Sequence, residues 1–143
     1  MSLRNDITSA IKNQSEIDFE FVRLNRYQEI LKRIAERFLA KGCLSLTHIW
    51  LWEEFRHTVC NTQPPDVIAA IKQRLLPTER YWFLASEEDG KYWVANATGS
   101  GIISTLKEMY PFEYYIVDRT MNWILCENHH GLLIEATGTP LQG

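Results

Sequence analysis

Hydrophobic residues recur at helical spacing before Pro77, and β-branched and aromatic residues form short runs after it. The clearest helical pattern is NRYQEILKRIAERFLAKG, residues 25–42, whose apolar positions follow the 3.6-residue period. Asn25 is placed to cap its start, and Gly42 is placed to end it. We therefore predict a long amphipathic helix that packs one face against a sheet.

The rest of the first half is predicted as shorter elements, beginning with a short strand within IDFEFVRL, residues 17–24. Proline and capping residues set the expected ends of three further helices. These helices are 5–14 with Asn5 or Asp6 as N-cap, a segment from about Thr47 to Val59, and a segment opened by Pro65 or Asp66 and closed by Pro77.

The second half alternates short strands with one helix. RYWFLAS and KYWVANA flank the turn EEDG and form a hairpin signal, and GSGIISTLKEMYP follows as a helix with Ser100 as N-cap. FEYYIVD, NWILCEN and LLIEATG are three further strands joined by short connections. The order β-β-α-β-β-β predicts an α+β fold with an antiparallel sheet of about five strands. We expect one domain over 1–143, in which helices from about 1–77 cover one face of a sheet formed by about 78–138.

Composition narrows the class of protein. A net charge of −3 argues against a general nucleic-acid binder, which needs surplus Lys and Arg to neutralise phosphates. No apolar run reaches the roughly 18 residues of a membrane span, and the N-terminal residues lack the hydrophobic stretch of a secretory signal. The cysteines are odd in number and form no CxxC pair, so we expect reduced thiols in a cytoplasmic protein without a cofactor.

WILCENHHG, residues 123–131, is the stretch richest in chemical groups. Strand alternation puts Glu127 on the face opposite Cys126 and Asn128, and makes Cys126 a small core residue. The following histidines and glycine are predicted to form the turn. Three interpretations stay open: a structural turn, a binding surface, or a site in which Glu127 and His129 or His130 act as an acid–base pair or the two histidines bind a metal.

Two other segments carry open alternatives. HIWLWEEFRH, residues 48–57, is either a second core helix or an interface anchor built on Trp50, Trp52, Glu53 and His57. TGSGI, residues 98–102, resembles an anion-binding helix start but lacks the P-loop lysine, which favours a plain helix start.

The segment from about 80 to 138 resembles a group of small uncharacterised bacterial proteins that share an FEYYIVD…WILCENHHG signature. The matching positions are Glu113, Tyr114, Tyr115, Trp123, Glu127, Asn128, His129, His130 and Gly131. The small size, acidic character and absence of a recognised catalytic set are similar to those of immunity proteins of bacterial toxin systems.

Our leading hypothesis is a non-enzymatic cytoplasmic protein that binds another protein, as an immunity or regulatory factor. An aromatic-rich sheet face and the 50–57 segment would supply the contact. The expected binding residues are Trp50, Trp52, Glu53, His57, Tyr115, Trp123, Asn128, His129 and His130. The rival hypothesis is a small hydrolase or metal-dependent enzyme that uses Glu127, His129 and His130, with Asp118 or His57 nearby.

Overall fold

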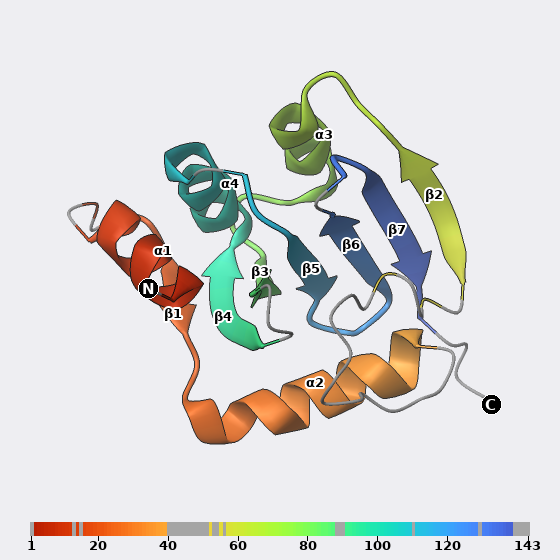
Figure 1. The fold of residues 1–143 in the computed structure, drawn as a ribbon, viewed down its shortest axis with the longest axis horizontal. Coiled ribbons are helices and arrows are strands. Elements are labelled where there is room, and N and C mark those ends of the chain that lie inside the picture. The colour runs from red at the N-terminus through yellow and green to blue at the C-terminus, as the bar shows by residue number, and fades with distance from the viewer. Residues whose placement is uncertain are drawn as a thin grey trace.

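A computed structural model describes residues 2–12, 14, 16–39, 52, 55, 57–87, 91–109, 111–128 and 130–138. Within them, seven strands form one antiparallel sheet in the order β1-β4-β3-β5-β6-β7-β2 (Figure 1). The strands are β1 Phe19–Phe21, β2 Thr58–Thr62, β3 Arg80–Ser86, β4 Tyr92–Thr98, β5 Tyr114–Asp118, β6 Trp123–Glu127 and β7 Leu133–Thr137. The described helices are α1 Leu3–Ile11, α2 Leu24–Phe38, α3 Val67–Arg74 and α4 Gly99–Glu108.

The predicted α+β class and the β-β-α-β-β-β order of the second half are confirmed as β3-β4-α4-β5-β6-β7. Both β4 and β5 pair antiparallel with β3, so α4 crosses over β3 to connect two strands that run in the same direction. The first half adds a strand at each edge, because β1 pairs with β4 and β2 pairs with β7.

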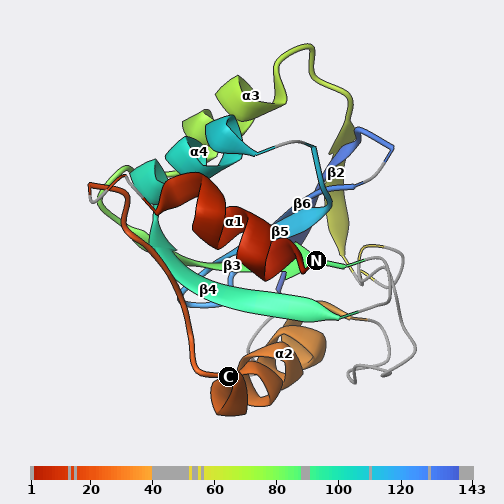
Figure 2. The same ribbon diagram turned by 60° about the vertical axis from the view of Figure 1, so that its left-hand side comes forward.

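Helices cover both faces of the sheet (Figure 2). α2 packs on one face, where Ile30, Ile34 and Phe38 meet sheet residues that include Trp82 and Tyr115. α1, α3 and α4 pack on the other face, over sheet residues that include Phe83, Ile116 and Leu125. We call these the α2 face and the α4 face. Since the central strands are buried on both faces, residues 81–85 of β3 and 114–117 of β5 are apolar or aromatic without a break.

Several sequence predictions need correction. The sheet has seven described strands rather than about five, and the N-terminal helices are divided between its two faces rather than placed on one. The predicted helix ending at Val59 is wrong at its end, because Thr58 and Val59 belong to β2; most of that helix falls outside the described residues. Its β-branched end favours a strand once β7 offers a pairing edge.

The helix ends also differ from their predicted caps. Ser2 rather than Asn5 or Asp6 caps α1, by accepting a hydrogen bond from Asn5 N. Thr98 rather than Ser100 caps α4, while Asp66, one of the two residues predicted to open α3, is its N-cap. α2 begins after Arg23 without a side-chain cap and ends before Leu39, and Gly42 lies outside the described residues. None of the described helices combines the length and the apolar character that a membrane crossing needs.

Candidate functional site

The stretch WILCENHHG contains strand β6 and described residues of the turn that follows it. Ile124 and Cys126 face the α2 side and Leu125 faces the α4 side, as the alternation predicted, and Cys126 is fully buried. Asn128 builds the turn: its Oδ1 atom accepts hydrogen bonds from His130 N and Leu132 N, each at 3.0 Å. Gly131 has a φ of 77°, a conformation that glycine adopts without strain. The side chain of Asn128 therefore has a structural task at this turn.

Glu127 and His130 belong to opposite faces of the sheet. The Tyr114 hydroxyl donates a 2.6 Å hydrogen bond to Glu127 Oε1, and the Tyr114 ring lies in the core of the α4 face. Burial and the neighbouring Glu127 raise the pKa of Tyr114, so its phenol stays protonated. The His130 ring lies edge-on to Trp52 at a centroid distance of 6.3 Å, and Trp52 packs against the core of the α2 face. His129, the third residue of the proposed acid–base set, lies outside the described residues.

A buried polar cluster on the α2 face joins Trp52 to the end of β5. We call Trp52, Glu113, Tyr115 and Cys126 the Glu113 cluster. The Trp52 indole donates to Glu113 Oε1 at 3.2 Å, and the Tyr115 hydroxyl donates to Glu113 Oε2 at the same distance. Trp52 N donates to the Tyr115 hydroxyl at 3.4 Å. These bonds satisfy a carboxylate that is only 7% exposed, and they fix Trp52 on the sheet.

The phenol and the thiol of the Glu113 cluster are held in their protonated forms. Burial raises the pKa of Tyr115, and the neighbouring Cys126, Tyr92 and Glu113 raise it further. Burial, followed by the charge of Glu113, also raises the pKa of the Cys126 thiol well above its usual value. Since the thiolate is the nucleophile, a thiol held protonated is a poor one. The cluster serves to hold segments together and has no activated nucleophile among its described atoms.

The whole chain matches one family. The family of unknown function DUF6756 covers residues 1–142, so the match extends well beyond residues 80–138. The chain belongs to DUF6756. No curated protein and no solved structure matches it. Membership confirms the resemblance to an uncharacterised family and supplies no activity.

Other predicted site residues of this DUF6756 chain lie apart from the Glu113 cluster. Trp123 packs against the core of the α4 face, beside the Tyr81 ring, and the Arg74 guanidinium lies 5.2 Å from its ring centre. His57 is exposed just before β2, and its carbonyl oxygen accepts a hydrogen bond from Thr137 N. Trp50 and Glu53 lie outside the described residues. Of the nine predicted binding residues, the structure thus brings Trp52, Tyr115 and His130 together on one face, with Asn128 in the same turn as His130.

Metal binding needs several ligands in one place. Within the described ranges, which omit His129, no three His, Cys, Asp or Glu side chains are grouped to hold an ion. Asp118, which the rival hypothesis placed near the site, instead accepts hydrogen bonds from Asn122 N and Trp123 N in the β5–β6 turn.

The TGSG segment is explained by packing. Gly99 N donates to Glu79 O, Ser100 N to Pro77 O, and Gly101 N to Thr98 Oγ1, so these amides of α4 have partners within the chain. A Cβ on Gly101 would lie 2.2 Å from the carbonyl oxygen of Asp18, and one on Gly99 would lie 2.3 Å from that of Leu76. The glycines let α4 approach two backbone segments, and the helix start offers no free amides of these residues to an anion.

Two features were missed from the sequence. The sequence singles out Glu113 only as one of the positions that carry the family resemblance, and its partner Trp52 is 61 residues away, so no local pattern could pair them. The exposed strand β2 was not predicted, and its first two residues, Thr58 and Val59, were assigned to the end of a helix, although TVCNT has the β-branched residues typical of a strand.

Proposed function

We propose that the protein is a non-enzymatic protein-binding module that holds an extended segment of its partner along the outer edge of β2. The observation that carries the proposal is the exposure of this strand. β2 ends the sheet, and its one strand partner in the described part of the chain is β7. All five of its residues are exposed, and none of them is charged.

Edge strands present backbone N–H and C=O groups that can pair with another chain, and many proteins protect them with charges, prolines or short length. β1, at the other edge, has three residues and carries Glu20. β2 has five residues and neither charge nor proline, and Val59 is 58% exposed. A bulge between Thr58 and Cys60 leaves Cys60 to Thr62 as its regular part. These features support the addition of a short partner strand.

This proposal moves the contact away from most of the predicted binding residues. Tyr115 and Asn128 are buried, which does not favour a place on a contact surface, whereas His57 directly precedes β2 and keeps its predicted role. The enzyme alternative gains no support, since Glu127 and His130 belong to opposite faces of the sheet. An immunity or regulatory role in the bacterial cytoplasm belongs to the same proposal and rests on the sequence resemblance alone.

The test uses two matched variants. Val59→Lys places a charge on the β2 edge, and Leu76→Lys is the control, because Leu76 is 61% exposed and lies between α3 and β3. Tagged wild-type protein and both variants are used to capture partners from a lysate of the source cells. We expect a protein retained by the wild type and by Leu76→Lys and lost with Val59→Lys.

Hydrogen exchange on the purified complex then locates the contact. We expect partner binding to slow amide exchange in residues 58–62. Equal capture by both variants, or protection confined to other segments, would refute strand addition at β2. A wild-type protein that retains no partner would count against protein binding itself.

A further inference from the structure

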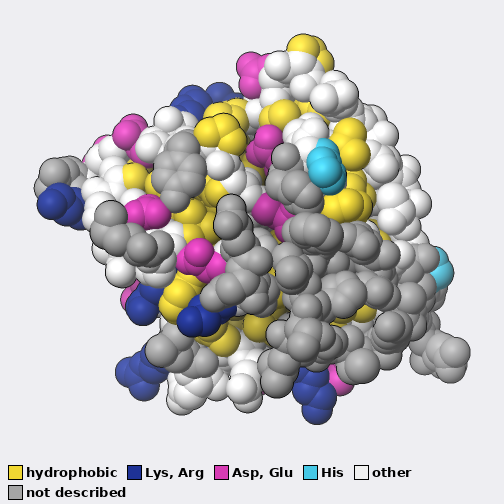
Figure 3. Space-filling model, viewed as in Figure 1, with side chains coloured by type: hydrophobic (Ala, Val, Ile, Leu, Met, Phe, Trp, Pro, Cys, Tyr) yellow, Lys and Arg dark blue, Asp and Glu magenta, His cyan; other side chains and the backbone are white. Residues whose placement is uncertain are grey.

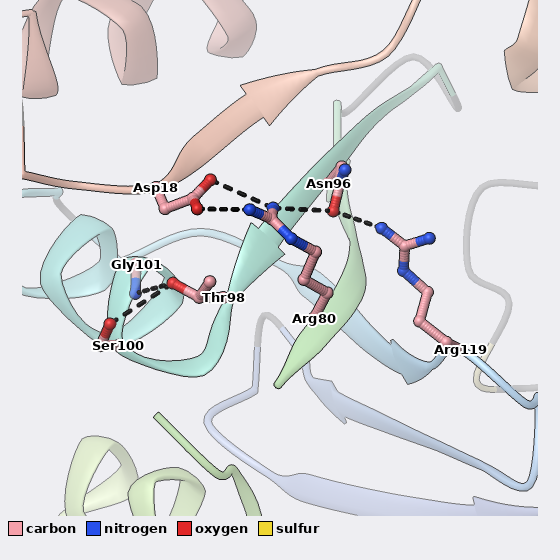
Figure 4. Close-up of polar contacts among 7 residues, drawn as sticks. All are labelled: Asp18, Arg80, Asn96, Thr98, Ser100, Gly101 and Arg119. Carbon is pink, nitrogen blue, oxygen red and sulfur yellow. Dashed lines mark hydrogen bonds and ion pairs between the residues drawn. The ribbon is translucent and has the colours of Figure 1, made fainter. Parts of the chain in front are cut away.

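Arg119 is held in a fixed position on the α2 face, at the end of the sheet opposite the Glu113 cluster. It follows β5, and its guanidinium carbon lies 3.8 Å from the centre of the Trp82 ring. Its Nη2 atom donates a hydrogen bond to Asn96 Oδ1 (Figure 4). Trp82 and Asn96 are direct neighbours across β3 and β4, so both contacts come from two paired strands of the sheet. Stacking on an aromatic ring and a hydrogen bond together limit the motion of the side chain.

Arg80, which lies near Arg119, is paired with a carboxylate. Arg80 donates to both oxygens of Asp18, at 3.2 and 2.6 Å, and is thereby neutralised. Arg80 also approaches the same Asn96 Oδ1 at 3.5 Å, so the two guanidinium groups lie on either side of this oxygen atom in Figure 4. Asp118, next to Arg119 in sequence, is turned into the β5–β6 turn. In the described part of the chain, Arg119 therefore has a ring and an amide oxygen as partners and no carboxylate.

Positive charge accumulates around Arg119. Partial burial lowers the pKa of Arg119, and the positive charges of Arg80, which is paired with Asp18, and of Arg26 lower it further. Positive charges that lie close together repel one another and destabilise the folded state. Their presence here contrasts with the net charge of the protein, which is −3. An added anion would relieve the repulsion.

We propose that Arg119 anchors a binding site for a carboxylate carried by an acidic segment of another protein. The planar guanidinium group can donate two parallel hydrogen bonds to a carboxylate. The neighbouring Arg80–Asp18 pair already has this bidentate geometry. Arg26 adds attraction for a second acidic residue on the same segment. The site is distinct from the proposed β2 contact, because β3 and β4 are separated from β2 by β5, β6 and β7.

A carboxylate suits the site better than a phosphate. Asp18 already neutralises Arg80, whereas the described partners of Arg119 are the Trp82 ring and an amide oxygen, with no carboxylate among them. A phosphate group carries close to two negative charges and is favoured by clusters of several unpaired arginines.

The experiment measures binding of a fluorescent oligoglutamate peptide by anisotropy, with an oligoglutamine peptide of the same length as the uncharged probe. Arg119→Gln should weaken oligoglutamate binding about tenfold, as expected for the loss of a charge-assisted bidentate contact. Arg119→Lys keeps the charge without the fork and should fall between the wild type and Arg119→Gln.

Arg74→Gln is the matched control. Arg74 also stacks on a tryptophan, Trp123, but Glu135 already pairs with it at 2.9 Å. This substitution removes the same charge and a similar ring contact, so it should leave peptide binding almost unchanged. Asp18→Asn should tighten binding, because it frees Arg80. Circular dichroism and the melting temperature confirm that each variant is folded.

Several outcomes would overturn the proposal. If Arg74→Gln and Arg119→Gln weakened oligoglutamate binding equally, the effect would be one of general charge. If Arg119→Gln did not weaken binding, Arg119 would not be the binding residue. Binding of oligoglutamine as tight as that of oligoglutamate would exclude a carboxylate site. Displacement of the peptide by inorganic phosphate, under conditions where acetate has no effect, would identify a phosphate site instead.

Discussion

The approach of α4 to the backbone at Asp18 makes Gly101→Ala the most direct test of the packing described here. An ideal Cβ at this position would lie 2.2 Å from Asp18 O, 2.9 Å from Asp18 C and 3.1 Å from Thr98 Oγ1. The obstacle is backbone, and Asp18 O also accepts a hydrogen bond from Thr98 N. The added methyl group therefore has to push α4 away from the segment that leads into β1. Figure 3 shows one face of the folded protein, in the view of Figure 1.

The expected change combines two opposing terms. Replacing a helical glycine by alanine favours folding by about 1 kcal/mol, and overpacking a close-fitting interior opposes it by about 1–3 kcal/mol or more. Because the clash is with backbone and exceeds what a rotamer change could relieve, we place the cost at or above the upper end. The net prediction is a loss of about 2 kcal/mol in the free energy of unfolding, or roughly 6 °C in melting temperature.

Urea unfolding followed by tryptophan fluorescence measures this change. We expect a lower midpoint with the denaturant slope unchanged, since the surface exposed on unfolding is the same. Ser100→Ala is the control, because Ser100 is exposed in the same turn and its loss should change stability by less than about 0.5 kcal/mol. A Gly101→Ala protein as stable as the wild type would refute the packing explanation of the TGSG segment.

Four further predictions follow from the site. Tyr115→Phe removes a donor to buried Glu113 and should cost about 1–3 kcal/mol in urea unfolding, and an unchanged midpoint would contradict the hydrogen bond. Asn128→Ala deletes the acceptor for two turn amides and should cost about 1–2 kcal/mol, with faster amide exchange at His130 and Leu132 as a specific sign. Cys126 should resist alkylation in the folded protein at neutral pH while exposed Cys60 reacts, as peptide mass spectrometry can show; rapid native labelling of Cys126 would contradict its burial and raised pKa. The pKa values of Tyr114 and Tyr115 are raised in the folded protein, so the unfolded chain loses its phenolic protons first; stability should be insensitive to these groups below pH about 10 and fall above it, less steeply in Tyr115→Phe.

Local sequence patterns predicted the structure correctly where it depends on residues that are close together in the chain. The alternation in WILCEN correctly separates Cys126 from Glu127, because side chains on a strand must point to opposite faces. The turn that contains Asn128, His130 and Gly131 also followed from local residue types. The sequence further held an unused signal for two covered faces, since β3 and β5 are apolar at successive positions, a pattern typical of strands buried on both sides.

The features that the sequence did not predict depend on contacts between residues far apart in the chain. β2 becomes a strand because β7 provides an edge 75 residues further along the chain, which the aromatic spacing around Trp52 does not reveal. Neither the contact of Trp52 with Glu113 nor the placement of Arg119 over Trp82 has a signature in spacing, because each depends on how strands align in the finished sheet. The N-cap of α4 moved from Ser100 to Thr98 for a similar reason, since the approach to Asp18 and Leu76 starts the helix at Gly99.

The position of β1 and β2 at the two edges of the sheet has a consequence for the order of events during synthesis. Both strands are translated before the strands that receive them, β4 and β7. While the nascent chain lacks β7, β2 has no strand to join, and α1 and α2 have no sheet to cover. Pairing over such long separations is slow, because a large loop must close first. We therefore expect the first half of the chain to depend on chaperones, or to stay extended near the ribosome, until the second half has formed its five strands.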